Sequence, residues 1–181
     1  MNSTNSKIHK IVFSGVIAAL YAALTIAVAP LSYGIVQLRF SEALCILPFF
    51  FPFTVWGLFV GCIVANLFST VHIVDVGVGS IASLLAAFCT MWIGRQLNRE
   101  RFLTKAFACF PPVIINAIII GAMIAYVTFG TSEQEGFLVA AGMVGAGQFI
   151  VMYVLGLPLM LFLSISPVLN KLNNLYGGKS L

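Results

Sequence analysis

The residues with the clearest chemical potential in this sequence are Arg39 and Glu42, a cation and an anion three positions apart. They belong to the stretch 33–44, and about thirty residues on either side are apolar enough to lie in lipid. A charged side chain in a bilayer costs about 2.5–3.5 kcal/mol on insertion scales, so it marks a candidate functional site. Two interpretations are open. Either Arg39 extends to the lipid headgroups and Glu42 pairs with it, or both residues contact a ligand.

Other polar side chains are expected at a similar depth, from several different helices. They are Gln37, Asn66, His72 and Asp75 in the outer half of the membrane, with Asn116 and Gln148 nearer its middle. Amide side chains in membranes often only link helices, for about 0.6 kcal/mol each on average. A few polar groups that converge within apolar walls are nevertheless typical of a small-molecule site. Tyr33, Phe40 and Phe68 would add aromatic surface to it.

Motifs for catalysis or for binding metal are absent from the sequence. It has no nucleophile elbow and no H-E-x-x-H, and a lone His72 among scattered carboxylates is no metal set. The tail 177–180 resembles the end of a phosphate-binding loop, but Asn173 stands where that loop needs glycine. Four cysteines without C-x-x-C spacing are expected as small buried side chains: Cys45, Cys62, Cys89 and Cys109. We therefore expect neither an enzyme nor a metalloprotein, and no cofactor in this chain.

The amino-acid composition indicates that these residues are positioned by helices within a membrane. Of 181 residues, 61% are hydrophobic and only 8% charged, and the mean hydropathy is +1.08. Soluble domains are about 25% charged, so this is predicted to be an integral membrane protein. The net charge of +4 does not favour nucleic acid, because the basic residues lie in short segments that flank the membrane.

Six apolar runs are predicted to form the helices of a membrane bundle, in which a full crossing needs about 17–25 residues. They cover residues 8–29, 40–51, 53–70, 79–97, 106–129 and 137–165. Pro48 is expected to kink the second run, and Gly156 with Pro158 to bend the long sixth run. The prediction is one all-α transmembrane domain over residues 1–181, with cytoplasmic tails at about 1–7 and 167–181.

The positions of lysine and arginine predict the orientation. Eight of the nine lie in the N-terminus, the connection 95–105 or the C-terminus: Lys7, Lys10, Arg95, Arg99, Arg101, Lys105, Lys171 and Lys179. With six crossings these three segments share one side, which the positive-inside rule makes cytoplasmic. Both termini are therefore expected in the cytoplasm, and Arg39 is the basic residue of the outer half. Trp56 and Trp92 then lie near the cytoplasmic boundary and are expected to anchor helices there.

Small residues recur every fourth position along the first run: Gly15, Ala19, Ala23 and Ala27. Helices in membranes associate by close packing, which small side chains permit. This small-residue stripe either packs on another helix of the same chain or is a docking face for another membrane subunit. The sequence leaves both interpretations open.

The first third of the chain resembles the QueT family of queuosine-precursor transporters, which are substrate-binding (S) components of energy-coupling factor (ECF) transporters. The residues that carry the resemblance are AALY at 18–21, APLSYG at 29–34, QLRFSEAL at 37–44, LPFF at 47–50, GLF at 57–59, GC at 61–62 and AN at 65–66. The remainder matches by its expected topology only. The resemblance implies an S-component bundle whose small-residue stripe contacts the membrane coupling subunit. It also implies two cytoplasmic ATPases that use ATP and drive toppling, which carries the substrate inward.

The implied substrate is a deazaguanine base, such as queuine or the pre-queuosine base. Its adjacent N–H and NH₂ groups could both bond to the Glu42 carboxylate, since charge-assisted bonds are about twice as strong as neutral ones. Arg39 could orient Glu42 or donate to the ring carbonyl, and Asp75 could bind an amine on the side arm. Phe40 or Tyr33 could cover the ring. Two alternatives stay open: an S component for another vitamin or heterocycle, and a structural membrane subunit without a ligand, in which Arg39 and Glu42 form a plain ion pair.

Overall fold

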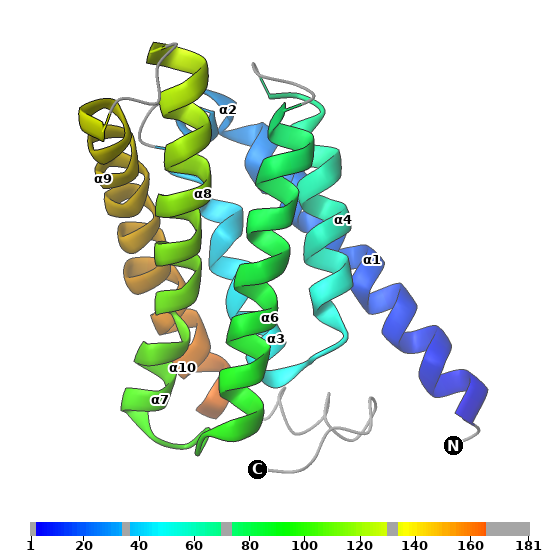
Figure 1. Ribbon diagram of the computed structural model, residues 1–181. Coiled ribbons are helices and arrows are strands. Elements are labelled where there is room, and N and C mark those ends of the chain that lie inside the picture. Colours follow the sequence, from blue (N-terminus) through cyan, green and yellow to red (C-terminus); the bar gives the residue numbers. More distant parts are fainter. Residues whose placement is uncertain (1–2, 34–36, 70–73, 130–133, 166–181) are drawn as a thin grey trace.

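The structure is a computed structural model that describes residues 3–33, 37–69, 74–129 and 134–165. Every regular element within these ranges is helical (Figure 1). In chain order the elements are α1 (Ser3–Ala27), α2 (Ala29–Ser32), η1 (Phe40–Ile46), α3 (Leu47–Phe50), α4 (Thr54–Asn66), η2 (Asp75–Gly79), α6 (Ser80–Gln96), α7 (Phe102–Ala108), α8 (Phe110–Phe129), α9 (Gln134–Ile150), η3 (Val151–Gly156) and α10 (Leu157–Ile165).

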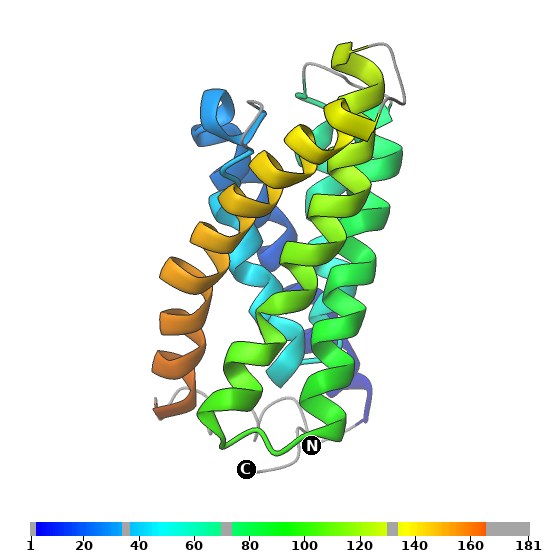
Figure 2. The same ribbon diagram turned by 60° about the vertical axis from the view of Figure 1, so that its left-hand side comes forward.

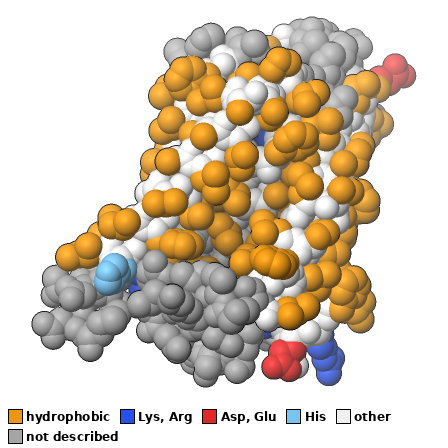
Figure 3. Space-filling view, turned by 180° about the vertical axis from the view of Figure 1, so that it is seen from behind, with side chains coloured by type: hydrophobic (Ala, Val, Ile, Leu, Met, Phe, Trp, Pro, Cys, Tyr) orange, Lys and Arg blue, Asp and Glu red, His pale blue; other side chains and the backbone are white. Residues whose placement is uncertain are grey.

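Four helical stretches are long and apolar enough to cross a membrane. They are Lys7–Ala27, Asp75–Gln96, Phe102–Val127 and Glu135–Ile165. The second and third predicted runs form shorter apolar helices, Phe40–Phe50 and Thr54–Asn66. The all-helical membrane bundle is thus confirmed, whereas six full crossings stay a prediction. Hydrophobic side chains cover most of the height of the face in Figure 3, as a surface in contact with lipid requires.

The start of α1, the connection from α6 to α7 and the end of α10 lie at the same end of the bundle (Figures 1 and 2). This is the arrangement expected if the basic segments share one side of the membrane. Which side that is stays a prediction. The opposite end holds α2, the end of α8 and the start of α9 (Figure 1).

We expect the connection between α6 and α7 to be cytoplasmic, since Arg95, Arg99 and Arg101 are concentrated there. Asn98→Cys should react with a membrane-impermeant maleimide in inside-out vesicles and not in intact cells. The background needs only Cys89→Ser, because the other three cysteines are buried. Glu135→Cys, at an exposed position in the first turn of α9, should show the reverse pattern. Labelling of Asn98→Cys only from outside would contradict this orientation.

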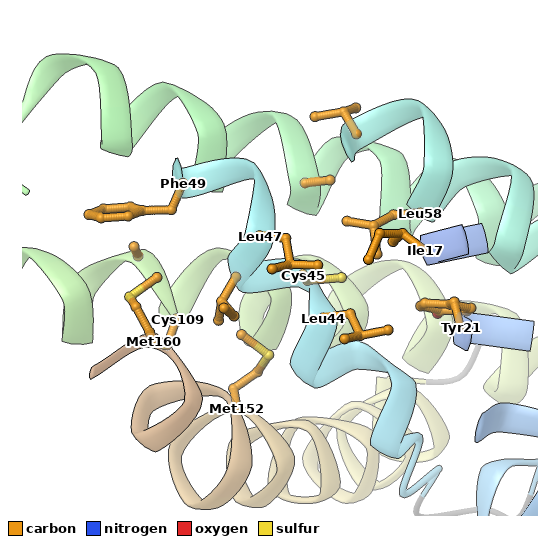
Figure 4. Packing of buried hydrophobic residues seen from close by; sticks show 14 of the residues in the cluster. Ile17, Tyr21, Leu44, Cys45, Leu47, Phe49, Leu58, Cys109, Met152 and Met160 are labelled. Atoms are coloured by element: carbon orange, nitrogen blue, oxygen red, sulfur yellow. The ribbon is translucent and has the colours of Figure 1, made fainter. Parts of the chain in front are cut away.

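The segment Ser41–Phe51 lies at the centre of the bundle and is buried throughout. Figure 4 shows Leu44 and Cys45 of η1 and Leu47 of α3 among side chains from α1, α4 and η3. The expected kink at Pro48 is a change of helix type, from a 3₁₀-helix in η1 to an α-helix in α3. Pro48 occupies the first turn of α3, where its missing N–H costs nothing. A 3₁₀-helix of seven residues is unusually long, which often marks a functional segment.

Two segments differ from the sequence prediction. The fourth apolar run was predicted to begin at residue 79, but the helix begins earlier. Asp75–Gly79 forms the π-helix η2, which leads into α6. The glycines of this segment lower its helix propensity, but packing against α4, α6 and α8 overrides that preference. The long final helix contains a second π-helix, η3, which ends at Gly156, one of the two positions expected to bend it. Single π turns are frequent at functional sites.

Helix α1 packs on α4 through glycines. A Cβ atom on Gly61 would lie 2.7 Å from the Ala18 carbonyl oxygen, and one on Gly57 would collide with the Ser14 backbone. The two helices therefore approach closely through the face of α1 that carries Ser14, Ala18 and Tyr21.

The small-residue stripe lies on another face of α1. Gly15, Ala19, Ala23 and Ala27 are all exposed, and a Cβ atom on Gly15 would meet nothing within 4 Å. Helix α1 lies at the edge of the bundle (Figure 1). The interpretation that the stripe packs on another helix of this chain is therefore wrong for the helices that the structure describes. The docking interpretation stays open.

Candidate functional site

Glu42 is almost fully buried, at 1% exposure, and accepts hydrogen bonds on both carboxylate oxygens. Oε1 accepts from the Tyr21 hydroxyl at 2.5 Å and from the Ser83 hydroxyl at 3.1 Å. Oε2 accepts from the Cys45 thiol at 3.1 Å and from the Gln148 amide at 3.5 Å. Four helical elements, α1, η1, α6 and α9, thus meet at this carboxylate.

The two oxygens of Glu42 are held very differently. The Tyr21 bond is short, and hydroxyls are good donors to a carboxylate. A thiol is a weak donor, and 3.5 Å is the limit of a hydrogen bond. Oε1 is therefore firmly fixed, whereas a better donor could displace the partners of Oε2.

Arg39 does not pair with Glu42. Its guanidinium Nη2 lies 2.9 Å from Asp75 Oδ2, and the two side chains are 4% and 1% exposed. Arg39 has extended backbone angles (φ −87°, ψ 95°), whereas Glu42 lies inside η1, so the two do not share a helix face. The interpretation of Arg39 and Glu42 as a plain ion pair is wrong.

Arg39 also connects to the segment that precedes it. Its Nε donates to the Ser32 carbonyl oxygen at 3.2 Å, and its guanidinium lies over the Tyr33 ring, 5.5 Å from the centroid. Tyr33 in turn donates to the Ala65 carbonyl oxygen at 2.6 Å. Arg39 thus covers one face of the Tyr33 ring. The sequence had suggested that this ring could stack on a ligand.

A chain of polar contacts joins the Arg39–Asp75 pair to Glu42. Asn66 Nδ2 donates to the Asp75 carbonyl oxygen at 2.8 Å and to Cys62 Sγ at 3.4 Å. Cys62 Sγ lies 3.4 Å from Ser83 Oγ, and Ser83 donates to Glu42. Two groups from distant parts of the sequence therefore form one buried polar network.

Several buried polar atoms of the described residues have no hydrogen-bond partner. They are Ser32 Oγ, Asn66 Oδ1, Asp75 Oδ1, Ser80 Oγ and Asn116 Oδ1. A buried polar group without a partner costs about 1–3 kcal/mol. All five are oxygen atoms, and three are acceptors only. These buried positions therefore have unused capacity for hydrogen bonds from a donor.

The other residues that the sequence suggested for the site differ in how deeply they are buried. Gln37 is buried and has a positive φ of 47°, which is uncommon outside glycine. Phe40 is half-buried, Asn116 is buried, and Phe68 is 62% exposed and thus not part of a buried site. His72 lies outside the residues that the structure describes. Trp56 and Trp92 are exposed, as anchors require.

Four residues of the polar network were not predicted from the sequence to belong to a site: Tyr21, Cys45, Cys62 and Ser83. Three of the four cysteines are buried as predicted, but Cys89 is exposed, and Cys45 and Cys62 form polar contacts. Cys45 follows Glu42 by three positions, a spacing that could have indicated contact. Ser83 lies 41 positions from Glu42, and no local pattern connects them. Within the described residues, no group of three or more His, Cys, Asp or Glu side chains could hold a metal ion.

The chain is similar in sequence to known proteins. A family model described as "QueT transporter" matches residues 11–165. A curated relative, "Queuosine precursor transporter QueT" of Lactococcus lactis subsp. cremoris (strain MG1363), is 28% identical over 156 residues. That alignment covers 82% of this chain and 89% of the relative. No solved structure matches the chain.

Proposed function

Because this chain belongs to the QueT transporter family, we propose that it is the substrate-binding subunit of an ECF-type importer of a queuosine precursor. Membership of a transporter family, together with several long apolar helices, makes it a multi-pass membrane protein and not an enzyme. The relative's name supports a queuosine precursor as the substrate. The observation that carries the proposal is the buried polar network around Glu42 and Asp75, with acceptor oxygens that lack partners.

The recognition of the ring is assigned to Glu42. Adjacent N–H and NH₂ groups of a deazaguanine would take the place of the Cys45 thiol and the Gln148 amide at Oε2. Tyr21 and Ser83 would keep Oε1 in position throughout. Because the two displaced donors are weak, little energy is lost when the ligand replaces them. The half-buried Phe40 is the aromatic side chain that we assign to the ring face.

Transport would need partners that this chain does not contain. The exposed stripe of Gly15, Ala19, Ala23 and Ala27 offers a smooth surface on which a helix of a membrane coupling subunit could pack closely. Two cytoplasmic ATPases would supply the energy from ATP, and this chain would need no cofactor of its own. Both termini would then lie in the cytoplasm, on the side of the ATPases.

Mass spectrometry and calorimetry test the proposed substrate. We expect the purified protein to retain a deazaguanine that denaturation releases, and the emptied protein to bind an added deazaguanine base. Adenine is the matched control, because it lacks the adjacent N–H and NH₂ donors of the guanine edge. Retention of a different heterocycle would support an S component for another ligand. Absence of any bound or binding molecule would favour a structural subunit.

A further inference from the structure

We propose that the connection from α6 to α7 binds the phosphate group of an anionic phospholipid through Arg95, Arg99 and Arg101. This basic site lies at the end of the bundle that also holds the start of α1 (Figures 1 and 2). It is separate from the buried polar network, and the inference does not depend on the identity of the transported molecule.

Arg99 is held in a position from which it can bind an anion. Its Nε donates to the Gly94 carbonyl oxygen in the last turn of α6, where carbonyl groups lack partners within the helix. Its guanidinium also lies over the Phe49 ring, 6.0 Å from the centroid. Its side chain makes no other hydrogen bond in the part of the chain that the structure describes, so both terminal nitrogens are available. A guanidinium with free N–H groups in this fixed plane matches the oxygens of a phosphate.

Two further cations lie beside Arg99 without an anion to balance them. Burial lowers the pKa of the Arg99 guanidinium, and the charge of Arg95 lowers it further, so these two cations lie close enough to repel each other. Arg95 and Arg101 are exposed, and neither forms a salt bridge with a described residue. The segment 95–105 carries four basic residues and one acidic residue, Glu100, and thus a net charge of +3. A phosphate between the arginines would relieve the repulsion.

Exposed apolar side chains flank the basic site and favour a lipid over a free anion. Trp92 is 62% exposed and precedes Arg95 by three residues, which places the two on the same side of α6. Phe102 and Leu103, directly after Arg101, are 56% and 77% exposed. A phospholipid would contact the arginines with its phosphate and these apolar side chains with its acyl chains, whereas a soluble anion would use the charges alone.

A lipid is also favoured over a partner subunit, because the basic site lies away from the candidate docking face on α1. Helix α1 packs on α4, α4 packs on α6, and the site begins only at the end of α6. Clusters of basic residues next to a membrane helix attract anionic headgroups. The location and the charge of the site therefore both fit a phospholipid.

Native mass spectrometry of the purified chain tests the inference with phosphatidylglycerol and phosphatidylcholine that carry the same acyl chains. We expect the wild-type protein to bind phosphatidylglycerol about tenfold more tightly than phosphatidylcholine. Arg95→Gln should weaken binding of phosphatidylglycerol by about fivefold, as expected for one basic residue at an anionic surface, and should leave phosphatidylcholine unchanged. The melting temperature should stay the same, because Arg95 has no hydrogen bond or ion pair with the described residues.

Lys7→Gln is the matched control, because it removes one exposed positive charge near the start of α1, at the same end of the bundle. It should leave binding of phosphatidylglycerol nearly unchanged. Glycerol phosphate, which has the anionic group without acyl chains, should show no measurable binding at the same concentration. Equal binding of the two lipids, equal effects of the two substitutions, or tight binding of glycerol phosphate would overturn the lipid site. Loss of uptake by cells in Arg95→Gln with unchanged lipid binding would also overturn it and assign Arg95 to a contact with a protein subunit.

Discussion

Ala23→Leu will abolish uptake of the precursor by cells and leave binding by the purified protein largely unchanged. Ala23 is exposed on α1 and belongs to the stripe that no described helix covers. Leucine would hold the helix of a coupling subunit away from α1, and close approach is what small residues provide in membranes. Uptake is measured in cells that contain the complete transporter, and binding by calorimetry on the isolated chain.

The matched control is Ala146→Leu, which adds the same bulk at an exposed position of α9. It should support normal uptake, because α9 is not assigned to the coupling contact. Equal loss of binding and uptake in Ala23→Leu would show that the stripe serves the fold of this chain. Normal uptake in Ala23→Leu would show that the coupling subunit docks elsewhere.

Glu42→Gln will weaken binding of the precursor by about ten- to a hundredfold, because an unsatisfied buried group costs about 1–3 kcal/mol and each 1.4 kcal/mol is about tenfold. Glutamine has the same size but only one acceptor oxygen. If that oxygen stays with Tyr21 and Ser83, its NH₂ group takes the position of Oε2 and faces the donors of the ligand. Calorimetry on the purified variant measures the change.

Two controls separate recognition from folding. Glu135→Gln changes an exposed glutamate at the start of α9 and should leave the affinity unchanged. The thermal melting temperature of Glu42→Gln should stay close to that of the wild type, because glutamine still accepts from Tyr21 and Ser83. A properly folded Glu42→Gln protein with unchanged affinity would remove Glu42 from the site. A large fall in melting temperature would assign Glu42 a structural role instead.

The predictions for Ala23 and Glu42 both concern contacts of helix α1. Tyr21 points inward to Glu42, whereas Ala19 and Ala23, two positions away on either side, are exposed. Thr25 adds a second connection, because its hydroxyl lies 2.6 Å from that of Ser41. One helix therefore carries both the contacts to the candidate site and the candidate docking face. This arrangement places the site and the docking face within one helix diameter of each other, about 10–12 Å.

The amino-acid sequence alone determined the features that depend on composition and local spacing. Apolar runs of sufficient length predicted the membrane helices, since the length of a span follows from the thickness of a bilayer. The recurrence of small residues every fourth position predicted a smooth face on the first helix, because that spacing places side chains on one side of a helix. The rarity of charge within lipid singled out Arg39 and Glu42.

Only the tertiary structure decided which of these residues meet. Arg39 pairs with Asp75, 36 positions away, and not with Glu42, three positions away. Glu42 instead meets Tyr21, Ser83 and Gln148, which come from three other helices. Such contacts depend on how whole helices cross and rotate about η1, and the packing of many side chains together sets that arrangement. For the same reason, the acceptor oxygens without partners at Asn66, Asp75 and Ser80 are a property of the packed bundle and not of any local sequence pattern.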